Sequence, residues 1–535
     1  MSAPAVAHER TLRHLLTDTD RFVIAAELVT SRGLITERSG RRVLGLARAL
    51  AEHPRVDALS ITDNPGGNAM LSADTLGTDL IGRGQEVIIH LSCKDWNRNA
   101  LQSRGWKLAS EGFHNVLALS GDYPVEGYKG LAAPVFDIDS VGLLRMYADM
   151  NDGLVLDPAR GALERTQFFL GAVVTNHKRH EHEVMPQYFK LRKKLENGTA
   201  FVINQIGYDA RKDDELLRWL ELNELRVPVL ANVYVLSQRT ALVFSSGRIP
   251  GAMVTDELLA LVQQQAASPD GGRSFFLELA AKQVAIARGL GYRGAYIGGH
   301  LEAGDYDEIL RRADVFMPDD WRRFAREIQF SFPDEFHYFE QDPETGLSSS
   351  EVSRAYLESR RRREGHAPLR YRLSRKLHGA VFEPEAPLFA AGRAVYRAVE
   401  RGPRPVGKAL HLVEQAAKVP LFGCLDCGDC SLPEIAYLCP ESQCAKNQRN
   451  GPCGGTRDGK CEVGEKDCIW SLAYERLKKY GEEEQMLDGP VVIKDNALRG
   501  TSAWANTFLG RDHHARAEAG SGPTETSSPA DLPGG

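Results

Sequence analysis

The chain lacks several features that mark common protein classes. None of its apolar runs approaches the roughly 18 residues of a membrane-spanning helix, and residues 1–20 hold no apolar signal-peptide core. It has no basic stripe with interleaved aromatic residues, and its formal net charge is −6. We therefore expect a cytoplasmic protein with no membrane span and no nucleic-acid partner.

Cysteine is almost absent from most of the chain but is concentrated in one short C-terminal segment. Of the nine cysteines, Cys93 stands alone far upstream, where we expect a small buried hydrophobic residue. In a reducing compartment, clustered cysteines are more typical of metal binding than of disulfides. Two sets of four thiolates would fill two zinc or iron–sulfur sites, although spacing alone does not assign cysteines to sets. The clustered residues are Cys424, Cys427, Cys430, Cys439, Cys444, Cys453, Cys461 and Cys468.

Short apolar runs alternate with longer amphipathic stretches such as Arg41–Ala51 and Tyr188–Leu195. Apolar runs without alternation are typical of strands buried on both faces. Eight βα units in about 300 residues predict a (β/α)8 TIM barrel. A doubly wound open sheet is the alternative, weakened because no strand is followed by G-x-G-x-x-G. The predicted strands are Phe22–Leu28, Val56–Thr62, Glu86–Ser92, Asn115–Leu119, Gln167–Thr175, Ala200–Gln205, Val227–Tyr234 and Gly294–Ile297.

At 535 residues the chain is long enough for two or three domains. We expect an N-terminal extension at 1–19 and the barrel at 20–320. A helical connector at 321–420 then leads to a small cysteine-rich module at 421–485. Residues 486–535 form a C-terminal tail. We expect this tail to be disordered from about residue 511, because its Gly-, Ser- and Pro-rich sequence can bury little apolar surface. We assign no specific role to His513 and His514 beside that tail.

The predicted strands end in polar residues, and TIM-barrel enzymes work at that end. Glu27 lies within the apolar run FVIAAELV, so burial should raise the pKa of its carboxyl and suit it to be a general acid. The alternative is a structural glutamate paired with arginine. Asp122 could bind a heterocycle or cap a turn. The other polar strand ends are Ser60, Thr62, Asp63, His90, Ser92, Ser120, Asn204, Gln205 and Asn232.

Several blocks resemble one known family. The segments AELVTSRG, SITDNPGGN, HLSCKDWNRNALQS, NVLALSGDYP and LRKKLENGTAFVINQIGYD are similar, in order, to strand ends of methylenetetrahydrofolate reductases, over residues of about 20 to 310. The segment from Cys424 to Cys468 resembles the C-terminal module, or separate small subunit, found with some members. The resemblance implies a flavin-dependent barrel that interconverts 5,10-methylenetetrahydrofolate and 5-methyltetrahydrofolate in one-carbon metabolism.

The resemblance also implies roles for single residues. Glu27 would be the acid that helps to open the methylene-bridged ring before a hydride passes from flavin N5. Asp122 would lie beside the flavin ring as a second catalytic residue, and Gln205 would hold the pterin of the substrate. The residues matched to FAD binding are Thr62, His90, Ser120, Gly121, Asp122 and Lys194.

The chain departs from the family pattern at several of these positions. Ser120 replaces the arginine of the common Leu-Arg-Gly-Asp block, so one FAD contact is lost or replaced. Gln187 and Lys190 stand where some members use Asp and Asn for the FAD ribose and phosphate, and Ile206 stands where an aromatic residue often follows the glutamine. These changes affect the residues expected to bind NAD(P)H more than the residues expected to bind the flavin.

Electron supply and partners complete the interpretation. An iron–sulfur cluster in the module could relay electrons from ferredoxin or another electron-transfer protein, with NAD(P)H as the other donor, whereas zinc would make the module a docking or stability element. We expect tetrahydrofolate derivatives as substrates and a homo-oligomer. The alternative functions are a folate- or corrinoid-dependent methyltransferase, and a non-catalytic folate-binding or docking protein on the same barrel.

Overall fold

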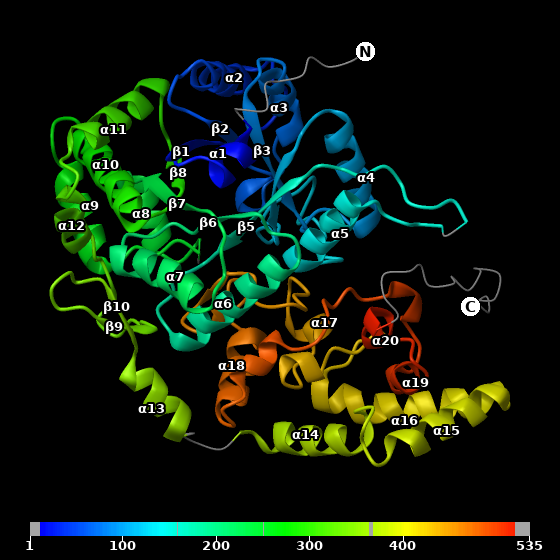
Figure 1. Cartoon of the computed structure of the whole chain (residues 1–535). Helices are drawn as coiled ribbons and strands as arrows, with labels where there is room; N and C mark the ends of the chain where they lie inside the picture. The colour runs from blue at the N-terminus through cyan, green and yellow to red at the C-terminus, as the bar shows by residue number, and fades with distance from the viewer. Residues whose placement is uncertain (1–10, 158, 250, 363–366, 519–535) are drawn as a thin grey trace.

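The eight predicted strands close into a parallel barrel in the computed structural model, which describes residues 11–157, 159–249, 251–362 and 367–518 (Figure 1). Each strand pairs with the next along the chain, and the last pairs with the first. The predicted TIM-barrel fold is therefore confirmed. The strands are β1 (Val23–Leu28), β2 (Ala58–Ile61), β3 (Glu86–Ser92), β4 (Asn115–Leu119), β5 (Phe169–Val174), β6 (Phe201–Asn204), β7 (Val229–Val235) and β8 (Gly294–Gly299).

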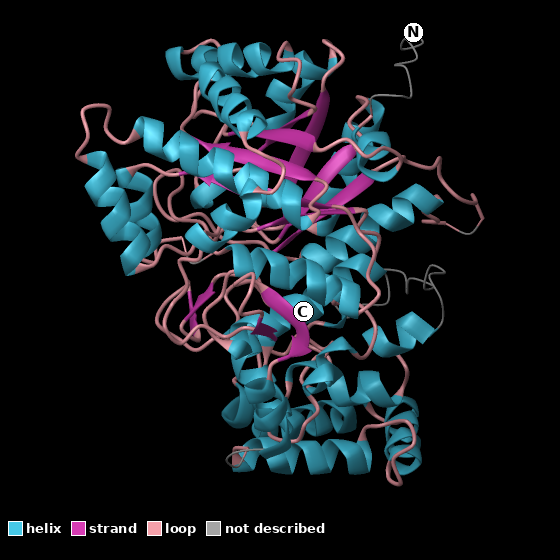
Figure 2. Cartoon of the chain, turned by 60° about the vertical axis from the view of Figure 1, so that its left-hand side comes forward, coloured by secondary structure: helices cyan, strands magenta, loops and turns pink. Residues whose placement is uncertain are grey.

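Helices between the strands cover the outside of the barrel, and Figure 2 shows the magenta strands surrounded by them. Every residue of β2 and β6 is buried, which explains why the sequence shows continuous apolar runs there. The helices are α2 (Arg38–Ala51), α3 (Ala73–Ile81), α4 (Arg98–Ser110), α5 (Ser140–Asp152), α6 (Glu181–Glu196), α7 (Ala210–Leu222), α8 (Gln238–Ser245), α9 (Asp256–Ala266), α10 (Arg273–Leu290) and α11 (Ala303–Val315).

A short helix, α1 (Leu12–Thr17), closes the N-terminal end of the barrel. Its leucines pack against strand residues from inside the barrel, among them Phe169 and Phe201. The backbone N–H of Leu12 donates to the carboxylate of Glu86, the first residue of β3, at 2.8 Å. Because α1 fills this end, a ligand can enter the barrel at the carboxyl ends of the strands.

The segment after the barrel is helical only in part. An antiparallel hairpin interrupts the predicted connector and packs on α7, where the backbone N–H of Ser348 donates to Asp214 at 2.9 Å. In Figure 1 the helices α14 to α16 lie along the edge of the molecule away from the barrel. The elements are α12 (Asp320–Glu327), β9 (Phe339–Gln341), β10 (Ser348–Val352), α13 (Arg354–Arg362), α14 (Leu369–Val381), α15 (Phe389–Arg401) and α16 (Arg404–Phe422).

The cysteine-rich segment shares a hydrophobic core with the barrel. Tyr188 of α6 and Trp219 of α7 belong to the same buried cluster as Trp470 and Tyr474 of the module. Figure 1 shows α18 beside α6. The module is therefore packed on the barrel rather than tethered to it. Its elements are α17 (Pro440–Gln443), β11 (Thr456–Arg457), β12 (Lys460–Cys461), α18 (Ile469–Lys478) and the 3-10 turns η3 (Pro433–Ile435) and η4 (Glu483–Leu487).

The chain stays ordered further towards its C-terminus than the sequence predicted. Helices α19 (Ala503–Phe508) and α20 (His513–Glu518) follow the module, whereas disorder was expected from about residue 511. The rest of the predicted tail, 519–535, lies outside the described residues. Within the described part of the chain, we find no helix whose length and apolar character would let it cross a bilayer.

Candidate functional site

A large cavity opens at the carboxyl ends of the barrel strands, with a volume of about 1840 Å³. Of the predicted barrel site residues, all except Lys194 line it: Glu27, Thr62, His90, Ser120, Gly121, Asp122 and Gln205. The module supplies part of the wall, so the cavity lies between the two parts of the chain. The module residues in the wall are Lys446, Cys453, Gly454, Gly455, Glu462, Val463 and Gly464.

The carboxyl of Glu27 is held inside the cavity by groups from β8. The hydroxyl of Tyr296 donates to Glu27 Oε1 at 3.1 Å, and the backbone N–H of Gly299 donates to the same carboxylate. A Cβ on Gly298 would lie 2.5 Å from Oε2, so glycine makes room for the acid. Burial raises the pKa of Glu27 above its ordinary value, although both hydrogen bonds oppose this. Glu27 is therefore held by a tyrosine and a backbone N–H, and not by the arginine that the alternative interpretation expected.

A second buried group extends this network to β2 and β3. The Nε2 atom of His90 lies 2.8 Å from the hydroxyl of Ser60, and its ring stacks on that of Tyr296 with centroids 6.5 Å apart. Burial lowers the pKa of His90 to about 4. The imidazole is therefore neutral near pH 7 and adds no charge beside Tyr296, the hydrogen-bond partner of Glu27.

The loop after β4 presents Asp122 at the rim of the cavity. Its Oδ2 accepts from the backbone N–H of Gly66 at 2.7 Å. Gly121 adopts a φ of +85°, and a Cβ there would lie 2.9 Å from the Cβ of Ser92. The turn that exposes Asp122 therefore requires glycine before it.

Thr62 and Gln205 are both fixed by the backbone. The hydroxyl of Thr62 donates to the carbonyl of Leu28 at 3.4 Å. The Gln205 carbonyl oxygen accepts from the backbone N–H of Ile206 at 2.9 Å, so the amide is oriented by its own turn. An amide held in this way can offer its N–H₂ group to a ligand.

The module segment Lys446–Thr456 covers the barrel between β4 and α6. The side-chain oxygen of Gln448 accepts from Ser120 Oγ and from Lys190 Nζ, each at 2.9 Å. Lys190 also donates to the carbonyl of Gly451 at 3.1 Å. Two positions that the family resemblance associates with FAD, Ser120 and Lys190, therefore contact the module.

Lys194 is turned away from the cavity. Its Nζ donates to the carbonyl of Val173 at 2.6 Å, and the residue is buried. Burial, assisted by the charge of neighbouring Lys190, lowers the pKa of Lys194 to about 7. The residues matched to the flavin ring thus fit a shared cavity, whereas the lysine matched to the FAD phosphates does not face it. Gln187 is likewise buried.

The first four cysteines gather at the end of α16. They line one small cavity together with Lys418, whose ammonium group lies 3.6 Å from Cys430 Sγ. The backbone N–H of Asp426 donates to Cys424 Sγ at 3.4 Å. N–H groups and a cation around the sulfurs are suited to thiolates. This first set is Cys424, Cys427, Cys430 and Cys439.

The remaining four cysteines form a second set next to the barrel mouth. Cys453 interacts through charge with Cys444 and Cys468, and Cys444 interacts with Cys461 in the same way. Cys453 itself lines the large cavity. The backbone N–H groups of Gln448, Gly455 and Val463 donate to the sulfurs of Cys444, Cys453 and Cys461 at 3.4–3.5 Å.

Four thiolates in each set are the ligands of either a tetrahedral zinc ion or an iron–sulfur cluster.

Two residues of the site could not be identified from the sequence. Tyr296 stands in the run GAYIGG, where it looks like an apolar strand residue, and only the flanking glycines hint at a close approach. Lys446 lies between two cysteines and donates to the carbonyl of Gly121 at 2.7 Å. That contact joins positions 325 apart in the chain, which no local pattern signals.

The fold and cavity define a ligand-binding TIM barrel with a fused cysteine-rich module. The family model described as methylenetetrahydrofolate reductase matches residues 18–288, more than half of the chain. The model described as methylene-tetrahydrofolate reductase C terminal matches residues 405–497. The chain therefore belongs to the methylenetetrahydrofolate reductase family, as its strand-end motifs predicted. Comparison with curated proteins gave no match.

Several solved structures resemble the chain at low sequence identity. A Clostridium thermocellum protein that binds two copies of 5-methyl-5,6,7,8-tetrahydrofolic acid has a TM-score of 0.40 at 11% identity, over 55% of this chain and 93% of its own. A thermostable xylanase mutant from Cellvibrio japonicus reaches 0.34 at 9% identity, over 56% and 99%. A 2,3-dimethylmalate lyase reaches 0.31 at 14% identity, over 57% and 83%.

Proposed function

We propose that this protein is a flavin-dependent reductase that interconverts 5,10-methylenetetrahydrofolate and 5-methyltetrahydrofolate. The observation that carries the proposal is the buried Glu27–Tyr296 pair at the wall of a cavity of about 1840 Å³. A cavity of this size has room for a flavin ring and a pterin together. Membership of the reductase family supports the same assignment.

In this proposal Glu27 holds the proton that the folate ring nitrogen receives. Burial raises the pKa of Glu27, which favours the protonated acid nearer to neutral pH. Tyr296 and the Gly299 N–H fix the direction of the carboxyl, and neutral His90 supports Tyr296 through ring stacking. A bound flavin supplies hydride transfer.

The rim residues orient the two rings in this proposal. Asp122 places a carboxylate at the mouth, and the amide of Gln205 faces the pterin as a donor. The predicted role of Lys194 at the FAD phosphates stays a prediction, and its burial counts against it.

We further propose that both cysteine sets hold iron–sulfur clusters. The second set would supply one-electron transfer beside the flavin cavity, because Cys453 lines its wall. The first set lies further from the mouth, in a separate small cavity. A ferredoxin-like carrier or NAD(P)H would then be the electron donor.

Anaerobic purification tests the proposal directly. We expect flavin absorbance, about eight iron atoms per chain with matching acid-labile sulfide, and folate turnover. NADH, NADPH and reduced ferredoxin are then added separately, and bleaching of the flavin identifies the donor. A colourless, flavin-free protein would favour the methyltransferase or the docking protein instead. Zinc without iron would contradict the cluster assignment but leave the flavin site standing.

A further inference from the structure

We propose that Glu434, His513 and His514 form a binding site for a divalent cation, best suited to Zn²⁺, which fastens the C-terminal helix α20 to the cysteine-rich module. Oε1 of Glu434 lies 3.2 Å from His513 Nε2 and 2.5 Å from His514 Nε2. The three ligand atoms all lie within 4.8 Å of one another. The site is separate from both cysteine sets and does not depend on the proposed function.

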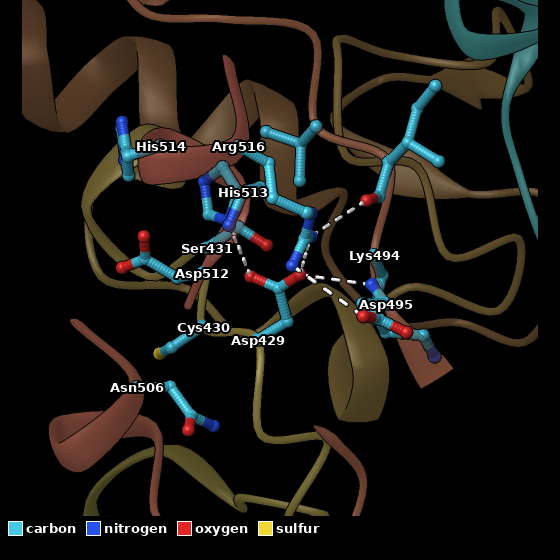
Figure 3. Close-up of polar contacts among 12 residues, drawn as sticks. Asp429, Cys430, Ser431, Lys494, Asp495, Asn506, Asp512, His513, His514 and Arg516 are labelled. Atoms are coloured by element: carbon cyan, nitrogen blue, oxygen red, sulfur yellow. Dashed lines mark hydrogen bonds and ion pairs between the residues drawn. The ribbon is translucent and has the colours of Figure 1, made fainter. Parts of the chain in front are cut away.

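The orientation of His513 is set by Asp429. The imidazole Nδ1 lies 2.7 Å from Asp429 Oδ1, and the backbone N–H of His513 donates to the same oxygen at 3.1 Å. Figure 3 shows the Asp429 carboxylate between His513 and Arg516, with dashed lines to both. Nδ1 of His513 thus faces Asp429, and Nε2 faces Glu434.

Both histidines direct Nε2 towards the same carboxylate oxygen, Glu434 Oε1. Each of these contacts holds either a proton or a bound cation between the nitrogen and the oxygen. Ligands at about 2.0–2.1 Å from a tetrahedral zinc lie roughly 3.3–3.4 Å apart, close to the 3.2 Å between Glu434 and His513, whereas Glu434 and His514, 2.5 Å apart, would separate on binding.

A second observation points to a cation independently. Oε2 of Glu434 is buried, and among the described residues it has no hydrogen-bond partner. The Glu434 side chain is only 10% exposed. A buried carboxylate oxygen without a donor is costly, and a bound cation would satisfy it. Hydrogen bonds to the two histidines occupy only the other oxygen.

The surrounding contacts match those of known metal-binding histidines. Such a histidine usually donates its second N–H to a carboxylate, as His513 does to Asp429. Asp429 is itself held by the backbone N–H of Asp495 at 3.0 Å and by Arg516. Two imidazoles and one carboxylate favour zinc over magnesium or calcium. His514 is 46% exposed, so the ion has a path from solvent and room for a water ligand.

The position of the site indicates its purpose. Asp429 lies between Cys427 and Cys430, and its backbone carbonyl accepts from Cys427 Sγ at 3.4 Å. Glu434 lies in η3, directly after the same cysteine loop. A cation at this point would therefore tie α20 to the loop of the first cysteine set and hold that loop in place.

Zinc titration of the full-length protein tests the proposal. The protein is purified without a polyhistidine tag, its cysteine-bound metal is retained, and weakly held metal is removed with a chelator. Calorimetry and metal analysis then measure zinc binding to the wild type, to His514→Ala and to Glu434→Gln. His14→Ala is the matched control, because it removes an imidazole from an ion pair with Asp18 elsewhere.

We expect one zinc equivalent beyond the cysteine-bound metal in the wild type and the control, with affinity reduced at least tenfold in both site variants. Iron content should be the same in all four proteins. Co²⁺ should give visible ligand-field bands without thiolate-to-metal charge transfer, since the ligands are nitrogen and oxygen. The proposal fails if the wild type takes up no additional zinc, if His514→Ala binds it equally well, or if cobalt binds through thiolate.

Discussion

Replacing Tyr296 with phenylalanine tests the assignment of Glu27 as the acid. The hydroxyl of Tyr296 donates to Glu27 Oε1 at 3.1 Å and so stabilises the charged carboxylate. A hydrogen bond to a charged group contributes about 1.5–3 kcal/mol. Since one pKa unit corresponds to about 1.36 kcal/mol, removing the hydroxyl should raise the pKa of Glu27 by about one to two.

The sign of the effect on turnover follows from the role of an acid. A general acid works in its protonated form, so activity is present below the pKa of Glu27 and is lost as pH rises through it. In Tyr296→Phe the basic limb of the kcat/KM profile for methylenetetrahydrofolate should therefore move up by about one to two pH units.

The control for this experiment is Tyr234→Phe. Tyr234 lines the same cavity but interacts with Glu27 through charge rather than a hydrogen bond. Its basic limb should stay within a few tenths of a pH unit of the wild type. Flavin content, measured by absorbance, should be equal in both variants. A basic limb that stays in place or moves down in Tyr296→Phe would refute the role of Glu27 as the titrating acid.

Three further predictions concern the acid, the joint between barrel and module, and the metal. Glu27→Gln should retain flavin and lose at least a hundredfold in folate turnover, because general acid catalysis contributes about 10²–10⁴-fold; turnover at the wild-type rate would contradict the assignment. Lys446→Met should lower the free energy of unfolding by about 3–5 kcal/mol, because it leaves Glu462 without its buried cation. Urea titration measures this loss, and adding Glu462→Leu should restore part of it. Cys453→Ser should lower iron content by about half while Cys93→Ser leaves it unchanged, and equal iron in both would argue against a cluster at the second set.

Local pattern was enough to predict the barrel. Each strand is a continuous apolar run because it is buried on both faces, and the predicted bounds of β3 and β4 agree with the structure. The sequence of residues 321–420 predicted only helices and missed the hairpin β9–β10, because its polar strand Ser348–Val352 lacks an apolar run. Its place depends on α7, where Asp214 accepts the Ser348 N–H, and that contact is not encoded locally.

The site residues likewise divide into those that local sequence predicts and those that depend on long-range contacts. Glu27, Asp122 and Gln205 could be predicted because they end strands of one barrel, and topology brings such ends together. The environment of Lys194 could not, because Lys190 beside it is covered by Gln448 from a segment 258 residues away. The order of α20 escaped prediction for a similar reason, since its polar sequence is stabilised by specific ionic contacts rather than by apolar burial.

The module completes the wall of the large cavity. Lys446 reaches the carbonyl of Gly121 next to Asp122, and Gln448 bridges Ser120 and Lys190, so the cavity wall and the flank of α6 are completed by the C-terminal segment. The two parts also share one hydrophobic core, so separation would expose apolar surface on each. In the proposed reductase, Cys453 in the cavity wall would bring the second cysteine set next to the flavin without a mobile domain. The covalent fusion therefore fixes a geometry that two independent chains would have to form by association.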